Sequence, residues 1–323
     1  MQTALELDLA AVPEPNPSAE PDGFVVLVDP NDRIHFLDWG GPDGAEVPDG
    51  AAGPAAAAAG VLLIHGLAQT AWIWTPVARR LRAACRTVAM DLRGHGLSDA
   101  PTQGYAEATL SGDAIAVADG SGLLARRVVL AGHGFGAVVA AWTAAALGDR
   151  CAGLVLVDGG WEDLRAATGM EPDEFLGGLD EPPEVLRSMD AFLADRMGWD
   201  PGSWDADQDR AARASVVETQ AGRVVPSTRP HALAGAVRAL FDYRPAEILA
   251  RVGAPVRVLA AAEDEAGTRG AALLAAQRAR ADAGHQPMLV ASFPTDGHNL
   301  MRYRPAAVAA AILGAGREAT IRR

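Results

Sequence analysis

The sequence has no lysine, only two cysteines and few aromatic residues, which make up 5% of the chain. Its 28 arginines are outnumbered by 41 acidic residues, and the net charge is −13. Affinity for nucleic acid is built by neutralising phosphates with Lys and Arg, so this balance argues against a nucleic-acid partner. Neither Cys85 nor Cys151 belongs to a C-x-x-C pattern, so we expect no disulfide framework and no cysteine nucleophile.

The sequence also lacks a long apolar run and a basic leader. Its longest apolar runs, such as residues 137–147, fall well short of the ~20 residues that cross a bilayer, so no membrane partner is expected. No arginine precedes Arg33, and a secretory signal would begin with positive charge. We therefore expect a soluble, cytoplasmic protein. Histidines at metal-ligand spacing are missing too, so neither a metal nor another cofactor is expected.

What the chain does have is length and apolar content. Its 323 residues are 49% apolar, enough to bury one large α/β core that carries an insertion. Residues 1–22 are rich in Ala, Glu, Asp and Pro, and this composition predicts a disordered tail because it buries too little surface. We assign residues 23–160 and 246–323 to the core and residues 161–245 to a helical cap.

Short apolar runs alternate with helix-length segments from Val61 onward. This alternation is typical of βαβ units and predicts a mostly parallel, doubly wound sheet. Two extended runs before it, at 24–28 and 33–39, predict a hairpin. The expected strands of the alternating region are 61–64, 87–90, 128–131, 154–157, 256–260 and 287–291, and the expected helices are 76–84, 106–124, 135–147, 267–283 and 306–313.

Residues 161–245 interrupt the alternation. They contain no convincing strand and three helix-like runs, at 183–197, 205–218 and 232–241. Their apolar side chains either roof a pocket or simply pack among themselves. Fourteen carboxylates and three arginines lie between Glu162 and Asp209, which indicates a solvated acidic face that an anionic substrate would approach against the field.

The most informative stretch is residues 128–137, VVLAGHGFGA, where an apolar strand breaks into a glycine-spaced turn and resumes as a helix. Strand, sharp turn and helix is the context in which a G-x-S-x-G motif presents a serine nucleophile. Here Gly134 stands in the serine's place. Such a turn holds its central residue at positive φ, which glycine adopts without strain.

Three further motifs follow expected strands: His65-Gly66-Leu67-Ala68, the stretch DLRGHGLSD at 91–99, and Gly297-His298-Asn299. Together with the turn at 132–136 they resemble the α/β-hydrolase superfamily, in the branch that carries a helical cap. The resemblance implies an α/β-hydrolase sheet over about residues 24–313. It also implies that Gly134 is a nucleophile position without a side chain.

The resemblance assigns further roles by position. The backbone amides of Leu67 and Phe135 would form an oxyanion hole, and His298 matches the catalytic base. An imidazole base needs an anionic partner that fixes its tautomer and stabilises its protonated form.

For that partner the resemblance favours Asp264. A one-residue difference in register would select Glu263 or Glu265 instead. Asp158, which follows an earlier strand, is the acid position in some relatives.

Glycine at position 134 closes the covalent route through an acyl-enzyme at that residue. The leading hypothesis is an enzyme for a small neutral or apolar ester, lactone or related carbonyl compound. His298 and Asp264 would act as the base, activating a water or abstracting a substrate proton in a lyase- or isomerase-like reaction.

Other interpretations stay open. The protein would be a ligand-binding pseudoenzyme if it keeps the pocket without the chemistry, or a serine hydrolase whose nucleophile has been exchanged for glycine. A minor alternative is dinucleotide binding, since residues 132–137 also satisfy G-x-G-x-x-A and Asp158 would then hold a ribose. The sequence leaves the oligomeric state undetermined.

Overall fold

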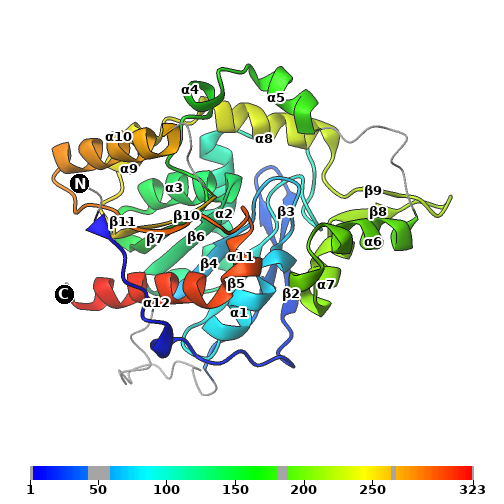
Figure 1. Ribbon diagram of the computed structural model, residues 1–323, viewed down its shortest axis with the longest axis horizontal. Coiled ribbons are helices and arrows are strands. Elements are labelled where there is room, and N and C mark those ends of the chain that lie inside the picture. The colour runs from blue at the N-terminus through cyan, green and yellow to red at the C-terminus, as the bar shows by residue number, and fades with distance from the viewer. Residues whose placement is uncertain (1–2, 43–58, 180–187, 263–266, 322–323) are drawn as a thin grey trace.

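A nine-stranded sheet runs through the centre of the computed structural model, which describes residues 3–42, 59–179, 188–262 and 267–321 (Figure 1). The strand order is β1-β11-β10-β7-β6-β4-β5-β3-β2. Only the β2–β3 and β3–β5 pairs of this sheet are antiparallel, which confirms the mostly parallel α/β class. The strands are β1 (Thr3–Ala4), β2 (Asp22–Val28), β3 (Asp32–Asp38), β4 (Gly60–Ile64), β5 (Thr87–Met90), β6 (Val128–His133), β7 (Cys151–Val157), β10 (Val256–Ala261) and β11 (Leu289–Phe293).

Helices cover both faces of this sheet (Figure 1). Every residue of the central strands β4, β6 and β7 is buried, as expected where helices lie on both sides of parallel strands. One apolar core lies between the sheet and α2, α3, α9 and α10, and the other lies between the sheet and α1 and α12. The helices of the core are α1 (Thr75–Leu81), α2 (Glu107–Gly120), α3 (Phe135–Leu147), α9 (Pro245–Ala250), α10 (Thr268–Asp282), α11 (Leu300–Tyr303) and α12 (Pro305–Ile321).

The N-terminal segment differs from the disordered tail that its composition predicts. Its strand β1 pairs in parallel with β11, and Leu5 is buried against the second core. Arg79 on α1 donates a hydrogen bond to the carbonyl of Ala19 (3.1 Å). A two-residue strand and single buried contacts leave almost no periodic pattern in a sequence, so composition alone misses them.

Residues 161–245 are helical but also contain a hairpin that the sequence does not predict. The helices are α4 (Leu164–Thr168), α5 (Pro172–Leu179), α6 (Met189–Trp199), α7 (Ala206–Ala214) and α8 (Pro230–Asp242), and the hairpin pairs β8 (Val216–Glu218) with β9 (Val224–Pro226). Part of the expected helix at 183–197 lies outside the described residues. Because β8 follows α7 closely in the chain, its valines extend the helix-like pattern of residues 205–218, and this pattern does not indicate a strand. The division of the chain into core and cap stays a prediction.

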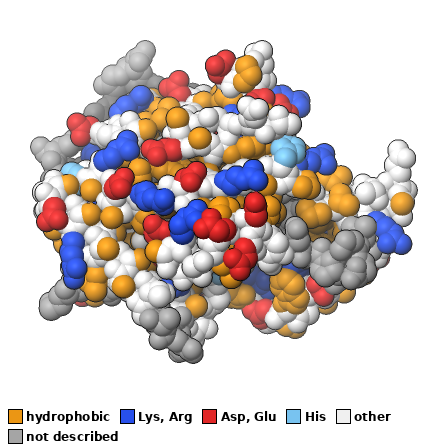
Figure 2. Space-filling view, turned by 90° about the horizontal axis from the view of Figure 1, so that it is seen from above, with side chains coloured by type: hydrophobic (Ala, Val, Ile, Leu, Met, Phe, Trp, Pro, Cys, Tyr) orange, Lys and Arg blue, Asp and Glu red, His pale blue; other side chains and the backbone are white. Residues whose placement is uncertain are grey.

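The surface over α4, α5, α8 and α10 is not uniformly acidic. Acidic and basic side chains stand next to one another there, with apolar patches between them (Figure 2). Arginine–carboxylate pairs among the described residues here include Arg165–Glu171, Arg238–Asp173, Arg244–Asp163 and Arg269–Glu162. Arginines therefore offset part of the negative charge carried by the acidic side chains of residues 162–209. No helix among the described residues is both long and apolar enough to span a bilayer.

Candidate active site

Gly134 occupies the turn between β6 and α3, at the carboxyl edge of the sheet. Its φ is +53° and its ψ is −117°, which confirms the positive φ expected of this turn. The flanking glycines are required by close packing: a Cβ on Gly132 would lie 2.1 Å from the carbonyl oxygen of Gly136, and one on Gly136 would lie 2.3 Å from that of His65. The glycine spacing of the motif therefore follows from backbone contacts.

His298 lies directly over this turn. It follows β11, and an ideal Cβ built on Gly134 would sit 3.2 Å from its Nε2. The other ring nitrogen, Nδ1, is 2.5 Å from Oδ2 of Asp158. The imidazole therefore stands between a carboxylate and the position that a nucleophile would occupy, and 57% of its side chain is exposed.

Asp158 comes from the end of β7, next to β6 in the sheet, and is 5% exposed. Its φ is +45°, a strained value for a residue other than glycine. Burial alone would raise the pKa of this carboxyl, but hydrogen bonds from His298 and Arg269 hold the pKa below its usual value. Asp158 is therefore ionised near neutral pH.

Asp264, which the sequence favours as the partner of His298, lies outside the described residues, as do Glu263 and Glu265. Among the described residues, the carboxylate on the imidazole is that of Asp158, which the sequence gives only as an alternative.

The same contact bears on dinucleotide binding. Oδ2 of Asp158 faces His298, and Oδ1 accepts hydrogen bonds from Arg269 (2.6 Å) and the Ala261 amide (2.8 Å), so this carboxylate is not open to a ribose.

The two amides expected to form an oxyanion hole belong to Leu67, which follows β4, and to Phe135, at the start of α3. Phe135 is the first residue of α3, where backbone amides have no partner within the helix. Leu67 follows Gly66, whose Cα lies 3.9 Å from the Cβ position built on Gly134. Across the described ranges, neither amide donates a hydrogen bond to the chain.

A buried histidine, His133, packs against His298. Its ring lies 4.3 Å from that of His298, and its Nε2 is 3.1 Å from the His298 carbonyl oxygen. Its Nδ1 lies 3.0 Å from Oε1 of Gln69, and the Gln69 amide donates to Asn299 (2.8 Å). Burial lowers the pKa of His133 to about 3. Gln69 lies outside the motifs of the sequence, and Asn299 belongs to the motif at 297–299 without a role assigned to it.

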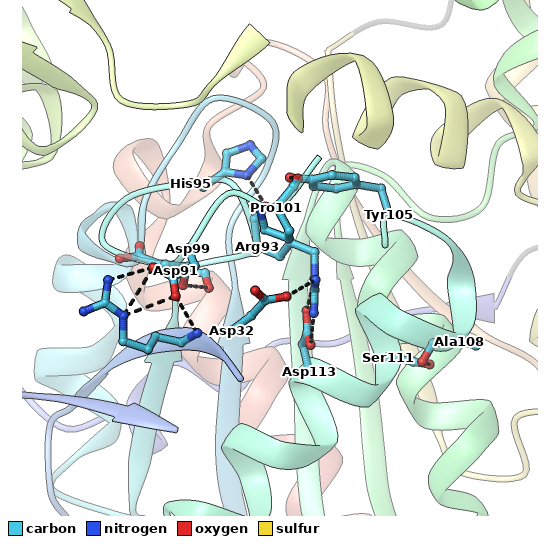
Figure 3. Close-up of polar contacts among 12 residues, drawn as sticks. Asp32, Asp91, Arg93, His95, Asp99, Pro101, Tyr105, Ala108, Ser111 and Asp113 are labelled. Carbon is cyan, nitrogen blue, oxygen red and sulfur yellow. Dashed lines mark hydrogen bonds and ion pairs between the residues drawn. The ribbon is translucent and has the colours of Figure 1, made fainter. Parts of the chain in front are cut away.

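Asp91 organises the neighbouring loop, and no contact among the described residues joins it to His298. Its Oδ1 accepts the Ala71 amide (2.7 Å), and its Oδ2 accepts the Leu97 amide (3.0 Å) and lies 2.8 Å from His35 Nδ1. His65 accepts the Leu92 amide through Nε2 (3.0 Å). His95 extends from the same loop, and its Nδ1 lies 3.1 Å from the carbonyl oxygen of Arg93 (Figure 3). His65 and His95 therefore brace backbone, whereas His35 in β3 contacts the Asp91 carboxylate.

Because three histidines are buried, we expect the free energy of unfolding to decrease as the pH becomes mildly acidic. Burial lowers the pKa of His65, of His95 (to about 3) and of His133 (to about 3), whereas the unfolded chain takes up these protons near pH 6.5. Below that pH the unfolded state binds more protons, so the free energy of unfolding falls by up to ~1.4 kcal/mol per pH unit for each ring. Denaturant titrations between pH 7.5 and 5.5 measure this slope. His95→Phe should make it shallower, and an unchanged slope would show that His95 is charged in the folded protein.

The fold and the site together define a class: a strand–turn–helix elbow under an imidazole–carboxylate pair, at the carboxyl edge of a mostly parallel sheet. Residues 61–311 match the alpha/beta hydrolase family. The chain belongs to that family.

One curated relative is the 2-(acetamidomethylene)succinate hydrolase of Mesorhizobium japonicum, which is 33% identical over 141 residues. The match covers 42% of this chain and 48% of the relative, about half of that protein's length. The crystal structure of E-2-(acetamidomethylene)succinate hydrolase has a TM-score of 0.71 at 22% identity, covering 91% of this chain and 98% of that one. The thioesterase domain from the curacin biosynthetic pathway has a TM-score of 0.65 at 21% identity, covering 91% and 99%. At these identities the two structures show a shared fold.

Proposed function

We propose that the protein hydrolyses a small carbonyl compound by activating a water, with His298 as general base, Asp158 as its partner and no covalent nucleophile. The observation that carries this proposal is the geometry at Gly134. The imidazole nitrogen Nε2 faces the space where a side chain would begin, while Nδ1 faces a buried carboxylate. An ionised Asp158 accepts a hydrogen bond from the Nδ1–H group, so Nε2 keeps its lone pair on the side of Gly134.

In this mechanism a water takes the place of the missing hydroxyl. Its oxygen attacks the substrate carbonyl carbon while Nε2 of His298 accepts its proton. The negative oxygen of the tetrahedral intermediate is stabilised by the amides of Leu67 and Phe135. The intermediate then collapses, the bond to the leaving group breaks, and the leaving group takes the proton from His298.

The substrate class rests on charge and on relatives. A net charge of −13 disfavours the approach of anions and favours a neutral or apolar ester, lactone or amide. The curated relative is named for hydrolysis of an acetamido compound, 2-(acetamidomethylene)succinate. A substrate panel for this chain therefore spans neutral esters and lactones together with acetamido compounds, both neutral and carboxylated.

His298→Gln is expected to lower turnover on this panel by about 10²-fold or more, because general-base catalysis contributes 10²–10⁴-fold. Asp158→Asn should lower it similarly, since an amide no longer fixes the tautomer of the ring. The measurement is kcat/KM for substrates turned over by the parent protein. His231→Gln, which changes an exposed histidine bonded to the Ala100 carbonyl, is the matched control and should keep the parent rate.

Turnover that survives His298→Gln would contradict the proposal, because the reaction would then not need this base. A parent protein that is inert on the whole panel but binds one of its members and releases it unchanged would favour the ligand-binding alternative. The two outcomes are separated by measuring binding calorimetrically and turnover on the same samples.

A further inference from the structure

We propose that Arg269 is a positioning residue for His298, the candidate base. Its guanidinium fixes the Asp158 carboxylate in one orientation and keeps it ionised. Nε2 of His298 is then the nitrogen that is free to accept a proton. This inference rests on the proposed function of His298 and Asp158. It adds a residue outside every motif that the sequence analysis singles out.

Arg269 meets the carboxylate on the side opposite to the imidazole. Its Nη2 lies 2.6 Å from Oδ1 of Asp158, while His298 Nδ1 lies 2.5 Å from Oδ2. Oδ1 also accepts the Ala261 amide at 2.8 Å. With both oxygens occupied from different directions, the carboxylate cannot rotate without breaking charge-assisted hydrogen bonds, which are stronger than neutral ones.

The guanidinium is itself held in place on several sides. Its Nη1 donates to the Ala261 carbonyl (2.6 Å), and its Nε donates to Glu162 (3.1 Å). Its central carbon lies 5.0 Å from the ring centroid of Trp161, which is 1% exposed. A planar fork can make these contacts at once, whereas an ammonium is a point charge and cannot.

The charge of Arg269 matters because Asp158 is buried. Burial favours the protonated carboxyl, and an adjacent arginine favours the carboxylate. A protonated Asp158 would keep its proton and donate a hydrogen bond to Nδ1 of His298, which would then act as the acceptor. The ring would then carry its hydrogen on Nε2, and this nitrogen would no longer accept a proton from water. Arg269 therefore protects the tautomer that the base requires.

The experiment follows the ionisation of Asp158 directly. In protein labelled with ¹³C at aspartate carboxyl carbons, the Asp158 signal is assigned by its loss in Asp158→Asn and then recorded against pH. Arg269→Gln should raise the pKa of Asp158 by about one pH unit or more, because an adjacent arginine lowers an aspartate pKa by 1–3. Arg269→Lys keeps the charge and should give a value between parent and Arg269→Gln.

The matched control is Arg213→Gln, which removes an exposed arginine paired with Asp209 one helical turn away. It removes the same charge and should leave the Asp158 titration unchanged. Circular dichroism of each variant verifies folding. Where the parent turns over a substrate, Arg269→Gln should lower kcat about 10- to 100-fold with little change in KM, because misplacement of a reacting group acts on the chemical step.

An Asp158 titration that is the same in Arg269→Gln and in the parent would overturn the inference, whatever the activity. A raised Asp158 pKa in a protein whose parent turns over nothing would instead support Arg269 and remove the hydrolytic proposal. If Arg269→Gln does not fold, Arg269→Lys carries the test, and an Asp158 pKa equal to that of the parent together with unchanged kcat would contradict the role of the fork.

Discussion

Gly134→Ser is expected to give the protein a covalent nucleophile: the variant should be labelled by a fluorophosphonate, and its ester turnover should rise by about 10²-fold or more. A Cβ at this position sits 3.2 Å from Nε2 of His298, so a serine hydroxyl would be within reach of the base. Deleting a triad member leaves only a small residual activity, so restoring one should raise turnover by a large factor. Labelling is measured by intact-protein mass spectrometry.

This gain has a conformational cost. The φ of +53° strains any residue but glycine by about 1–3 kcal/mol, and the contact with His298 requires the ring to shift slightly. The ring is more than half exposed, so it has room to give way. Gly134→Ala is the matched control, because it brings the strain and the Cβ without the hydroxyl and should be neither labelled nor activated.

A folded Gly134→Ser protein that resists the phosphonate would argue that His298 and the two loop amides are not arranged for nucleophilic catalysis. Labelling that persists in Gly134→Ser with His298→Gln would argue that another base serves the serine. Labelling that depends on His298 would show that only the hydroxyl is missing from the elbow, and it would favour the nucleophile-replaced interpretation.

Much of the fold could be predicted because its signals are local. Fully buried parallel strands are continuous apolar runs, and the glycine at 132 is required by a backbone contact within the same turn, with Gly136. The segments that the sequence misses, β1 and the β8–β9 hairpin, are two or three residues long. Strands this short depend on the surface that they meet, and their own pattern does not specify them.

The candidate site also has features that the sequence predicts and features that it does not. The sequence places His298 near Gly134 because both follow strands of one parallel sheet, whose carboxyl ends share an edge. It favours Asp264 over Asp158 by resemblance alone, because each follows a strand and the choice depends on where a side chain turns. The positive φ of Asp158 and the contacts of Arg269 are long-range features that leave no motif.

Arg93→Met is expected to destabilise the protein by about 3–5 kcal/mol, because it removes the cation from a buried ion network. Arg93 lies in the loop after β5 and is 3% exposed. Its guanidinium binds Asp113 on α2 through two hydrogen bonds, of 2.7 and 2.8 Å, and Asp32 at the start of β3 through one of 2.9 Å (Figure 3). Without the arginine, the carboxylates of Asp113 and Asp32 lose the cation that joins them. They are then left close together where little solvent reaches them.

The sign of the pH dependence tests this explanation. Burial already raises the pKa of Asp113 in the parent, and loss of Arg93 should raise it further. A folded-state pKa above the unfolded one means that the charged carboxylate destabilises the fold at high pH, and that this penalty lessens as pH falls through the folded-state pKa. The deficit of Arg93→Met relative to the parent should therefore narrow between pH 8 and pH 5 in denaturant titrations.

Two further variants separate charge from packing. Arg33→Met breaks an exposed pair with Asp99 near the same loop and should change stability little, since exposed ion pairs contribute little. Arg93→Met combined with Asp113→Leu removes both buried partners and should recover most of the loss, because replacing a buried pair by apolar groups costs far less than orphaning one charge. A double variant as unstable as Arg93→Met alone would show that the network acts through the shape of the arginine and that its charge is secondary.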